Sequence, residues 1–186
     1  MERKSHSRLL APRIRQNGSI PYRPLPDHRD PDFKRLTYGE PWGRINPLKE
    51  GDVAFFIESG TNDEWKSWGY YVVAYFVTER VYVYNAGNWT PKLEIEEHIE
   101  RINENAHAKR GDLHYAVLLG DVVRSKFLFT EPLKLTVGQG PILPVKFAMK
   151  LPISKRYTGY WWKTWFGAAQ TKALLTLINC RPQRPL

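Results

Sequence analysis

The run Tyr70–Val77 is the feature of this sequence that most restricts its fold. Seven of its eight residues are β-branched or aromatic, the types most favoured in strands. Val53–Ile57, directly after the turn Glu50–Asp52, is a second apolar run typical of a buried strand. A polar loop of twelve residues joins the two runs. We therefore predict a hairpin within a mostly antiparallel sheet or barrel.

Further elements follow the same kinds of signal. Strand patterns lie at Val81–Tyr84, past a bulge or turn at Thr78–Arg80, at His114–Leu119, and as a pair or one bent strand at Lys126–Phe129 and Leu133–Leu135. Thr90 and Pro91 predict a helix start, and the helix ends near Asn105. A second helix is expected from about Ala168 to Asn179. This order predicts an α+β fold, a small curled, mostly antiparallel sheet or barrel with two or more flanking helices.

The first fifty residues differ in character from the rest. They contain seven prolines, which break long helices, yet they also hold apolar residues that can pack. We expect residues 1–50 to form an ordered, irregular segment packed on the domain. Residues 51–180 are then the α+β domain, and 181–186 are a loose tail.

Charge is distributed unevenly along the chain. The formal net charge is +9, from 28 basic and 19 acidic residues. Residues 1–50 carry +5, residues 51–145 carry −4, and residues 146–186 carry +8. Two basic ends packed on one face form a field suited to a polyanion. Acidic protein partners, or a basic surface that serves only solubility, are the alternatives.

Cysteine content and hydropathy bear on the cellular setting. The single cysteine, Cys180, makes no internal disulfide and no zinc site by itself, which favours a reducing, cytoplasmic environment. No apolar run approaches the ~20 residues of a membrane-spanning helix. Met1–Lys4 is charged but lacks an apolar region behind it, so we expect no signal peptide and no membrane partner.

Several enzyme motifs are missing from the sequence. It has no GxGxxG or GxxxxGK[ST] phosphate loop, no HExxH helix and no GxSxG elbow. One cysteine excludes the zinc signature of the nucleobase deaminases. We therefore expect binding rather than catalysis, with no catalytic residue, resident metal or cofactor.

Two segments nevertheless have the residue types for acid–base work. Asp27–Asp32 holds three carboxylates and an imidazole, which suit a divalent metal, a polarised water, or the ordinary chemistry of turns. His107–Arg110 combines an imidazole with two cations, a set that suits a phosphate. A nuclease pair of His107 with His114 needs a neighbouring carboxylate as well.

Aromatic residues are more numerous than a core of this size requires. The segment Lys155–Phe166 interleaves cations with aromatic rings, and stacking of a base on such a ring is worth about 1–3 kcal/mol. Adjacent Trp161 and Trp162 face opposite sides of an extended chain, so one can be core while the other is exposed. Trp65 and Trp68 lie in a polar loop and are candidates for an aromatic cage around a base. Packing in the core is the alternative role of these rings.

The order of several short motifs resembles the PUA-like superfamily, which includes the EVE, YTH and ASCH groups. It is most similar to the third type of nucleotide modification associated domain. The motifs span about residues 5–135 and are His6-Ser7-Arg8, Pro21 to Asp27, Asp30-Pro31-Asp32-Phe33, Tyr38-Gly39-Glu40, Gly51-Asp52 with its strand, His107 with Arg110, and Arg124-Ser125-Lys126. The aromatic C-terminal block departs from that pattern.

The resemblance implies a curled β-barrel with flanking helices and a pocket for a nucleotide or modified base. By position, the pocket would draw on Arg8, Tyr22, Asp27, Asp32, Tyr38, His107 and Ser125. Relatives in the wider superfamily hold a modified base in an aromatic cage.

The leading hypothesis is a module that binds DNA or RNA, with a modified base in an aromatic pocket beside a basic surface. The predicted pocket contains the seven residues above and four tryptophans that could stack on a base, Trp65, Trp68, Trp162 and Trp165. The predicted phosphate contacts are Arg23, Lys109, Arg110, Arg124, Lys126, Lys155, Arg156 and Lys163. One alternative is a metal-dependent nuclease or nucleotide-processing enzyme that uses the Asp27–Asp32 loop with His107. Another is a protein-interaction module.

Overall fold

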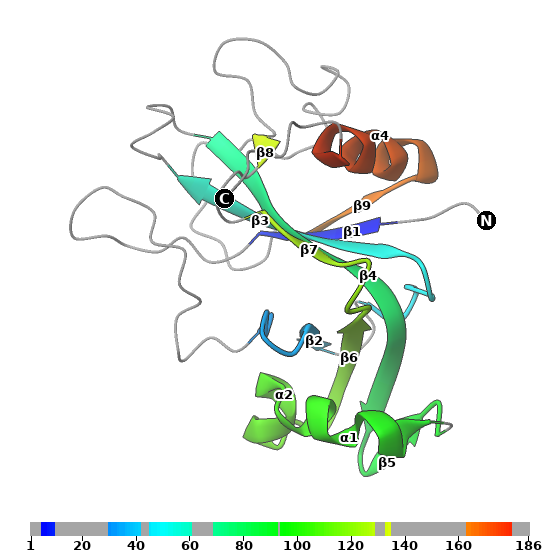
Figure 1. Cartoon of the computed structure of the whole chain (residues 1–186). Helices are drawn as coiled ribbons and strands as arrows, with labels where there is room; N and C mark the ends of the chain where they lie inside the picture. Colours follow the sequence, from blue (N-terminus) through cyan, green and yellow to red (C-terminus); the bar gives the residue numbers. More distant parts are fainter. Residues whose placement is uncertain are drawn as a thin grey trace. The chain divides into compact units, whose positions relative to one another are not determined.

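The chain divides into two compact units, each assembled from stretches that are separate in sequence. The first unit holds Met1–Pro21, Ala54–Tyr75 and Phe127–Leu186, and the second holds Tyr22–Val53 and Phe76–Lys126. The structure, a computed structural model, describes residues 5–9, 30–41, 45–60, 69–92, 94–128, 133–134 and 163–179 (Figure 1).

In its described residues, the first unit consists of a sheet and the helix α4. Its elements are the strands β1 (Ser5–Leu9), β3 (Val53–Gly60), the first part of β4 (Gly69–Asn85), β8 (Leu133–Lys134) and β9 (Lys163–Phe166), and the helix α4 (Ala168–Asn179). The strand order is β4-β3-β1-β9, with β8 paired to β4; the β1–β9 and β4–β8 pairs are antiparallel.

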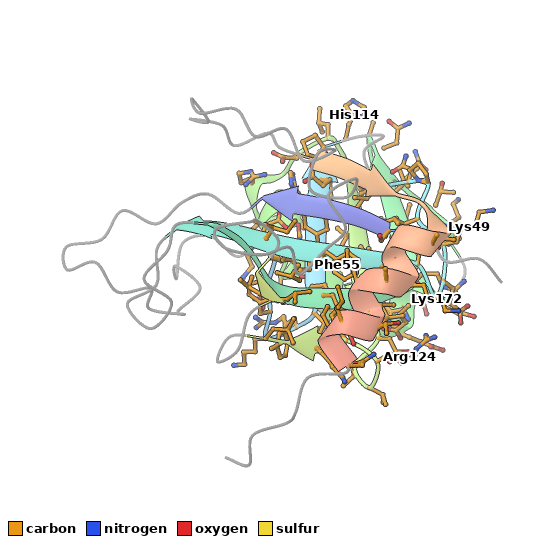
Figure 2. All side chains as sticks on the ribbon, turned by 90° about the horizontal axis from the view of Figure 1, so that it is seen from above. Lys49, Phe55, His114, Arg124 and Lys172 are labelled. Carbon is orange, nitrogen blue, oxygen red and sulfur yellow. The ribbon has the colours of Figure 1, made fainter. Side chains whose placement is uncertain are left out.

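The core of the first unit comes from its apolar strand runs. Phe55, Phe56 and Val73 are fully buried, whereas Lys172 on α4 is exposed to solvent (Figure 2). A hydrogen bond of 2.6 Å joins the hydroxyls of Ser5 and Thr171, and both residues are fully buried. This bond links α4 to β1. Separating the two elements would leave a buried hydroxyl without this partner, which is costly.

The described part of the second unit consists of a sheet and the helices α1 and α2. Its elements are β2 (Thr37–Pro41), the remainder of β4, β5 (Asn88–Thr90), β6 (His114–Gly120), the start of β7 (Lys126–Phe127), and the helices α1 (Ile95–Asn103) and α2 (Ala106–Arg110). The order is β2-β6-β4, with β5 paired to β4, and these pairs are all antiparallel. Ile102 of α1 packs into a buried cluster with Tyr82, Val117 and Leu119 of the sheet.

The predicted fold class is confirmed: the chain is α+β, with mostly antiparallel strands and flanking helices. The strand expectations for β3 and β6 and the helix expectation for α4 are also confirmed. The runs 70–77 and 81–84 form one strand, β4, whose register against β6 shifts between Thr78 and Arg80. This irregularity lies where a bulge or turn was expected.

The predicted start of the first helix is wrong. Thr90 pairs with Val83 in the β4–β5 hairpin, and α1 begins only at Ile95 after Glu94, which has a φ of 60°. The hairpin turns at Ala86 and Gly87, which both have positive φ, as a tight two-residue turn of the primed type requires. Strand pairing therefore overrides the local capping signal of Thr90 and its proline.

Two other elements differ from the sequence expectations. The proline-rich first fifty residues contain β1 and β2, although an irregular segment was predicted there. Of the strand pair expected after residue 126, the described residues contain β7 and β8, each two residues long.

Candidate functional site

His107 lies at the centre of a polar cluster in the second unit. Asn105 caps α2 by accepting a hydrogen bond from the His107 backbone N–H at 3.0 Å. The imidazole lies between two carboxylates: Nδ1 is 2.7 Å from Asp112 Oδ2, and Nε2 is 3.5 Å from Asp30 Oδ2. The side chains of His107 and Asp30 are only 8% and 10% exposed. The cluster thus joins the segment before β2 to α2 and to the loop after it.

Arg110 completes this His107 cluster, which we define as Asp30, His107, Arg110 and Asp112. Its Nη2 lies 3.0 Å from Asp112 Oδ2 and 2.9 Å from His107 Nδ1. Partial burial alone would raise the pKa of Asp112, but hydrogen bonds from Arg110 and His107 lower it below its ordinary value. Asp112 is therefore held as a carboxylate that accepts from both neighbours.

The geometry of the His107 cluster suits a structural role, in which hydrogen bonds and ion pairs hold neighbouring chain segments together. An ionised carboxylate only accepts hydrogen bonds, so His107 Nδ1–H donates to Asp112, and Arg110 Nη2 donates to Asp112 rather than to the protonated Nδ1. Nε2 faces Asp30. With both nitrogens directed at carboxylates and little exposure, the imidazole is poorly placed to exchange a proton with a bound substrate. Its evident role is to hold three chain segments together.

Within the Asp27–Asp32 loop, the described carboxylates of Asp30 and Asp32 serve the local backbone. Asp32 Oδ1 accepts from the backbone N–H groups of Lys34 and Arg35 at 2.9 and 3.0 Å. Asp30 Oδ1 accepts from the Gly39 backbone N–H at 2.5 Å. Among the residues that the structure describes, no group of three or more His, Cys, Asp or Glu is placed to hold a metal ion. Asp27 and His28 lie outside those residues.

Tyr38 and Glu40 form a buried polar pair on β2. Both residues are fully buried, and the Tyr38 hydroxyl donates a hydrogen bond to Glu40 Oε1. They are two apart on the strand, so both lie on the same face of the sheet. Tyr38, predicted for the pocket, is therefore part of the interior.

An aromatic cluster lies on β4, β5 and β6 of the second unit. Tyr84 and Trp89 are cross-strand partners with ring centroids 4.8 Å apart, and Tyr115 lies 5.1 and 5.5 Å from them. The ring of His107 stacks on Tyr115 at 5.8 Å with an interplanar angle of 15°. A sandwiched base needs its flanking rings about 7 Å apart, twice the contact distance of carbon atoms. These rings instead fill the space between one another.

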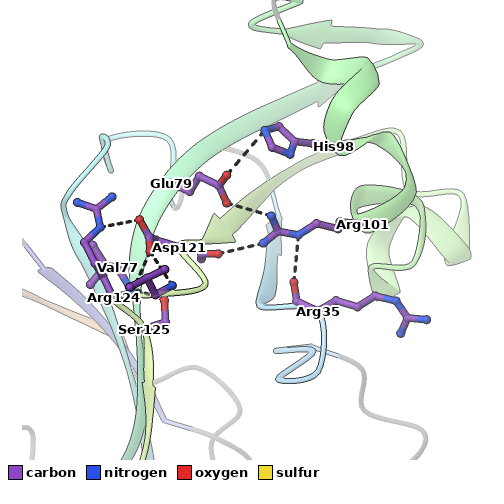
Figure 3. Close-up of polar contacts among 10 residues, drawn as sticks. Arg35, Val77, Glu79, His98, Arg101, Asp121, Arg124 and Ser125 are labelled. Carbon is purple, nitrogen blue, oxygen red and sulfur yellow. Dashed lines mark hydrogen bonds and ion pairs between the residues drawn. The ribbon is translucent and has the colours of Figure 1, made fainter.

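The turn Asp121–Ser125 holds two of the predicted contact residues. Asp121 Oδ2 accepts from Arg124 Nε at 2.6 Å, and Ser125 Oγ accepts from the Val77 backbone N–H at 3.1 Å (Figure 3). Ser125 therefore fixes the turn to β4. The side chain of Arg124 remains 41% exposed.

The structure describes some of the other predicted cations and aromatic residues, whereas the rest lie outside the described part of the chain. Lys109 and Arg110 are exposed on α2, where Lys109 Nζ donates to Glu104 at 2.6 Å, and Lys126 is exposed at the start of β7. Arg8 and Lys163 are backbone partners across the β1–β9 pair, and Trp165 is the partner of His6. The predicted residues that lie outside the described part are Tyr22, Arg23, Asp27, Trp65, Trp68, Lys155, Arg156 and Trp162.

The two units divide the predicted site between them. The first unit holds Arg8, Trp65, Trp68, Lys155, Arg156, Trp162, Lys163 and Trp165. The second unit holds Tyr22, Arg23, Asp27, Asp32, Tyr38, His107, Lys109, Arg110, Arg124, Ser125 and Lys126. The four tryptophans of the prediction thus belong to the first unit, and the pocket residues implied by the resemblance, except Arg8, belong to the second.

Two residues of the structural network were not singled out from the sequence. Asp112 anchors the His107 cluster, and Arg101 donates to Glu79 at 2.9 Å, to the Gly120 carbonyl at 3.0 Å and to the Arg35 carbonyl at 3.2 Å (Figure 3). Asp112 carries one usable signal, since it is a carboxylate five residues from a histidine across the helix-ending Gly111. Arg101 carries none, because its acceptors are distant in sequence.

Comparisons with protein-family models, with curated proteins and with solved structures gave no significant match to this chain. None of the helices in the described ranges has both the length and the apolar character needed to cross a bilayer.

Proposed function

We propose that the protein binds a nucleic acid, DNA or RNA, and that its first unit provides the charge for this binding. The observation that carries the proposal is the partition of charge between the two units. Across its whole sequence the first unit has 15 basic and 5 acidic residues, a net charge of +10. The second has 13 basic and 14 acidic residues, a net charge of −1.

This partition is sharper than the partition along the sequence. The acidic stretch in the middle of the chain belongs mainly to the second unit. Residues 1–21, with a net charge of +4, and the basic C-terminal residues 146–186 belong to the first. Phosphates attract such a concentration of cations, and release of their counterions supplies most of the sequence-independent affinity. A surface basic only for solubility has no reason to concentrate its charge in one folded unit.

We further propose that an aromatic pocket reads a base, and that the preferred base carries a modification. The candidates for this role are the tryptophans of the first unit, Trp65, Trp68, Trp162 and Trp165. Support comes from the described rings of Tyr84, Trp89 and Tyr115 in the second unit, which pack against one another and leave no space for a base between them. The resemblance to PUA-like domains implies the same class of ligand.

The experiment is fluorescence anisotropy with labelled single- and double-stranded DNA and RNA oligonucleotides over a salt series. Each oligonucleotide is paired with a copy that carries one methylated base. We expect the logarithm of the binding constant to fall linearly with the logarithm of salt concentration, by about 0.7 to 0.9 per phosphate contacted. The oligonucleotide that carries the preferred modification should bind more tightly than its unmodified counterpart. Absence of binding, or binding that is insensitive to salt, would contradict the proposal.

Two charge-matched double variants locate the binding. Lys155→Glu with Arg156→Glu removes cations of the first unit, whereas Lys49→Glu with Lys92→Glu changes the same charge on exposed residues of the second. We expect the first pair to lower the affinity at least tenfold and reduce the salt slope, and the control pair to have a much smaller effect. Equal losses would mean that net charge alone attracts the ligand.

A further inference from the structure

Two adjacent aliphatic side chains project from the second unit. Val122 and Val123 follow β6 and are 73% and 88% exposed. Single apolar residues at a surface are ordinary, but two together on one turn form a small apolar tip. Burial of apolar side chains is favourable, so a partner that covers this tip gains affinity from it.

The tip is held in place by its own backbone. Asp121 Oδ1 accepts from the backbone N–H groups of Val123 and Arg124, both at 2.9 Å. The Asp121 N–H donates to the Val77 carbonyl at 2.8 Å, and the Ser125 N–H donates to the Asp121 carbonyl at 3.0 Å (Figure 3). The backbone of the turn therefore loses little conformational entropy on binding. The β-branched valine side chains also lose little, because their χ1 angles are restricted. The turn is preorganised for contact.

The charges around the tip favour an anionic partner. Arg124 follows the two valines directly, and the exposed Lys126 lies two residues farther on. Partial burial would raise the pKa of Asp121, but bonds from Arg124 and Val123 lower it, so this carboxylate stays ionised and paired within the turn. The side of the turn that remains open combines aliphatic groups with cations.

We propose that the Asp121–Ser125 turn contacts the bases of the bound nucleic acid, with Val122 and Val123 as an apolar wedge and Arg124 on the neighbouring phosphate. Proteins that unstack bases insert apolar side chains between base steps and use cations to contact the same groove. The apolar tip is too small to hold a membrane by itself, because stable anchoring needs more apolar area. This inference rests on the proposed function and extends it to the second unit.

The test compares the wild type with Val122→Ser plus Val123→Ser on oligonucleotides that contain 2-aminopurine, whose fluorescence rises when it is unstacked. We expect the wild type to raise the fluorescence at one or more positions. The double variant should bind about tenfold more weakly and lose the fluorescence rise while it keeps its salt dependence. Leu113→Ser is the matched control, since Leu113 is 63% exposed in the same unit.

The outcomes separate the two proposals. Salt-dependent binding by the wild type with no effect of the double variant overturns the wedge and leaves the nucleic-acid proposal intact. Absence of nucleic-acid binding by the wild type overturns both. A third arm measures cosedimentation with phosphatidylserine vesicles. Vesicle binding that the double variant abolishes, with unchanged oligonucleotide affinity, would assign the tip to a lipid surface and overturn the wedge.

Discussion

Gly39 on β2 lies so close to Asn105 that a β-carbon on the glycine would stand 2.5 Å from the Asn105 Oδ1 atom. The same β-carbon would stand 2.5 Å from His107 Cδ2. Asn105 is fully buried and caps α2, and Gly39 donates its backbone N–H to Asp30. The strand and helix therefore approach as closely as backbone and side chain allow, and the His107 cluster is assembled around this contact.

Gly39→Ala should destabilise the second unit by about 2 to 4 kcal/mol. The added methyl group has to displace both the Asn105 helix cap and the His107 imidazole. Overpacking of this kind costs about 1 to 3 kcal/mol, and weakening of the interactions in the His107 cluster adds to that cost. Urea denaturation followed by circular dichroism measures the loss. Gly87→Ala is the control, because Gly87 has open space but a φ of 94°, and it should cost only about 1 kcal/mol. Equal losses in the two variants would show that the close approach is unimportant.

A double-mutant cycle on His107 and Asp112 should reveal a favourable coupling of about 1 kcal/mol. Nδ1 and Oδ2 are 2.7 Å apart, but the Asp112 side chain is 35% exposed, so solvent reduces the value below that of a fully buried pair. His107→Ala alone should cost more, about 2 to 4 kcal/mol, because it opens a cavity and leaves Asp30 and Asp112 without the imidazole. The free energies of unfolding of the wild type, both single variants and the double variant give the coupling. Additive losses would mean that the two residues act independently.

The stability of the second unit should fall in strongly alkaline solution because of Tyr115. Burial, with smaller contributions from Tyr84 and Asp112, raises the pKa of Tyr115 from 10.0 to about 12. The folded state then holds the phenol proton more tightly than the unfolded state, so its contribution is complete below pH 10 and is lost as the pH rises toward 12. The full loss is about 2 to 3 kcal/mol.

Urea titrations at several alkaline pH values measure this dependence, and tyrosinate absorbance follows the ionisation. Tyr115→Phe removes the titrating group and should flatten the profile over the same range. A variant profile as steep as that of the wild type would assign the alkaline loss to other groups.

Elements with a strong local signal were predictable from the sequence. β3, most of β4, β6 and α4 each contain a continuous apolar run or a clear stripe, which needs no knowledge of distant contacts. The start of α1 was not predictable in this way, because the pairing of Thr90 with Val83 decides it. Thr90 and Pro91 have the residue types of a helix start, but the cross-strand pairing of Thr90 places it in β5 instead.

The candidate site shows the same division between local and distant information. His107 and the acidic loop before β2 were singled out by residue type, and the structure places Asp30 3.5 Å from His107. Asp112 becomes their partner only because Gly111 adopts a φ of 71° and ends α2, which turns the chain back toward the imidazole. The spacing of the residues does not reveal that reversal, and it does not reveal that Tyr38 is buried.

Substitutions of Arg101 should show how much the stability of the second unit depends on a single guanidinium group. It donates to the carbonyls of Arg35 and Gly120 and to the carboxylate of Glu79, and its side chain is 25% exposed. Arg101→Met keeps the packing of the aliphatic chain but removes all three bonds, so we expect a loss of about 2 to 3 kcal/mol. Arg101→Lys keeps the charge beside Glu79 but lacks the planar fork that reaches several acceptors, so it should restore only part of the loss. Chemical denaturation of the three proteins measures both effects. A lysine variant as stable as the wild type would show that charge alone matters, and a methionine variant as stable as the wild type would show that the bonds add nothing.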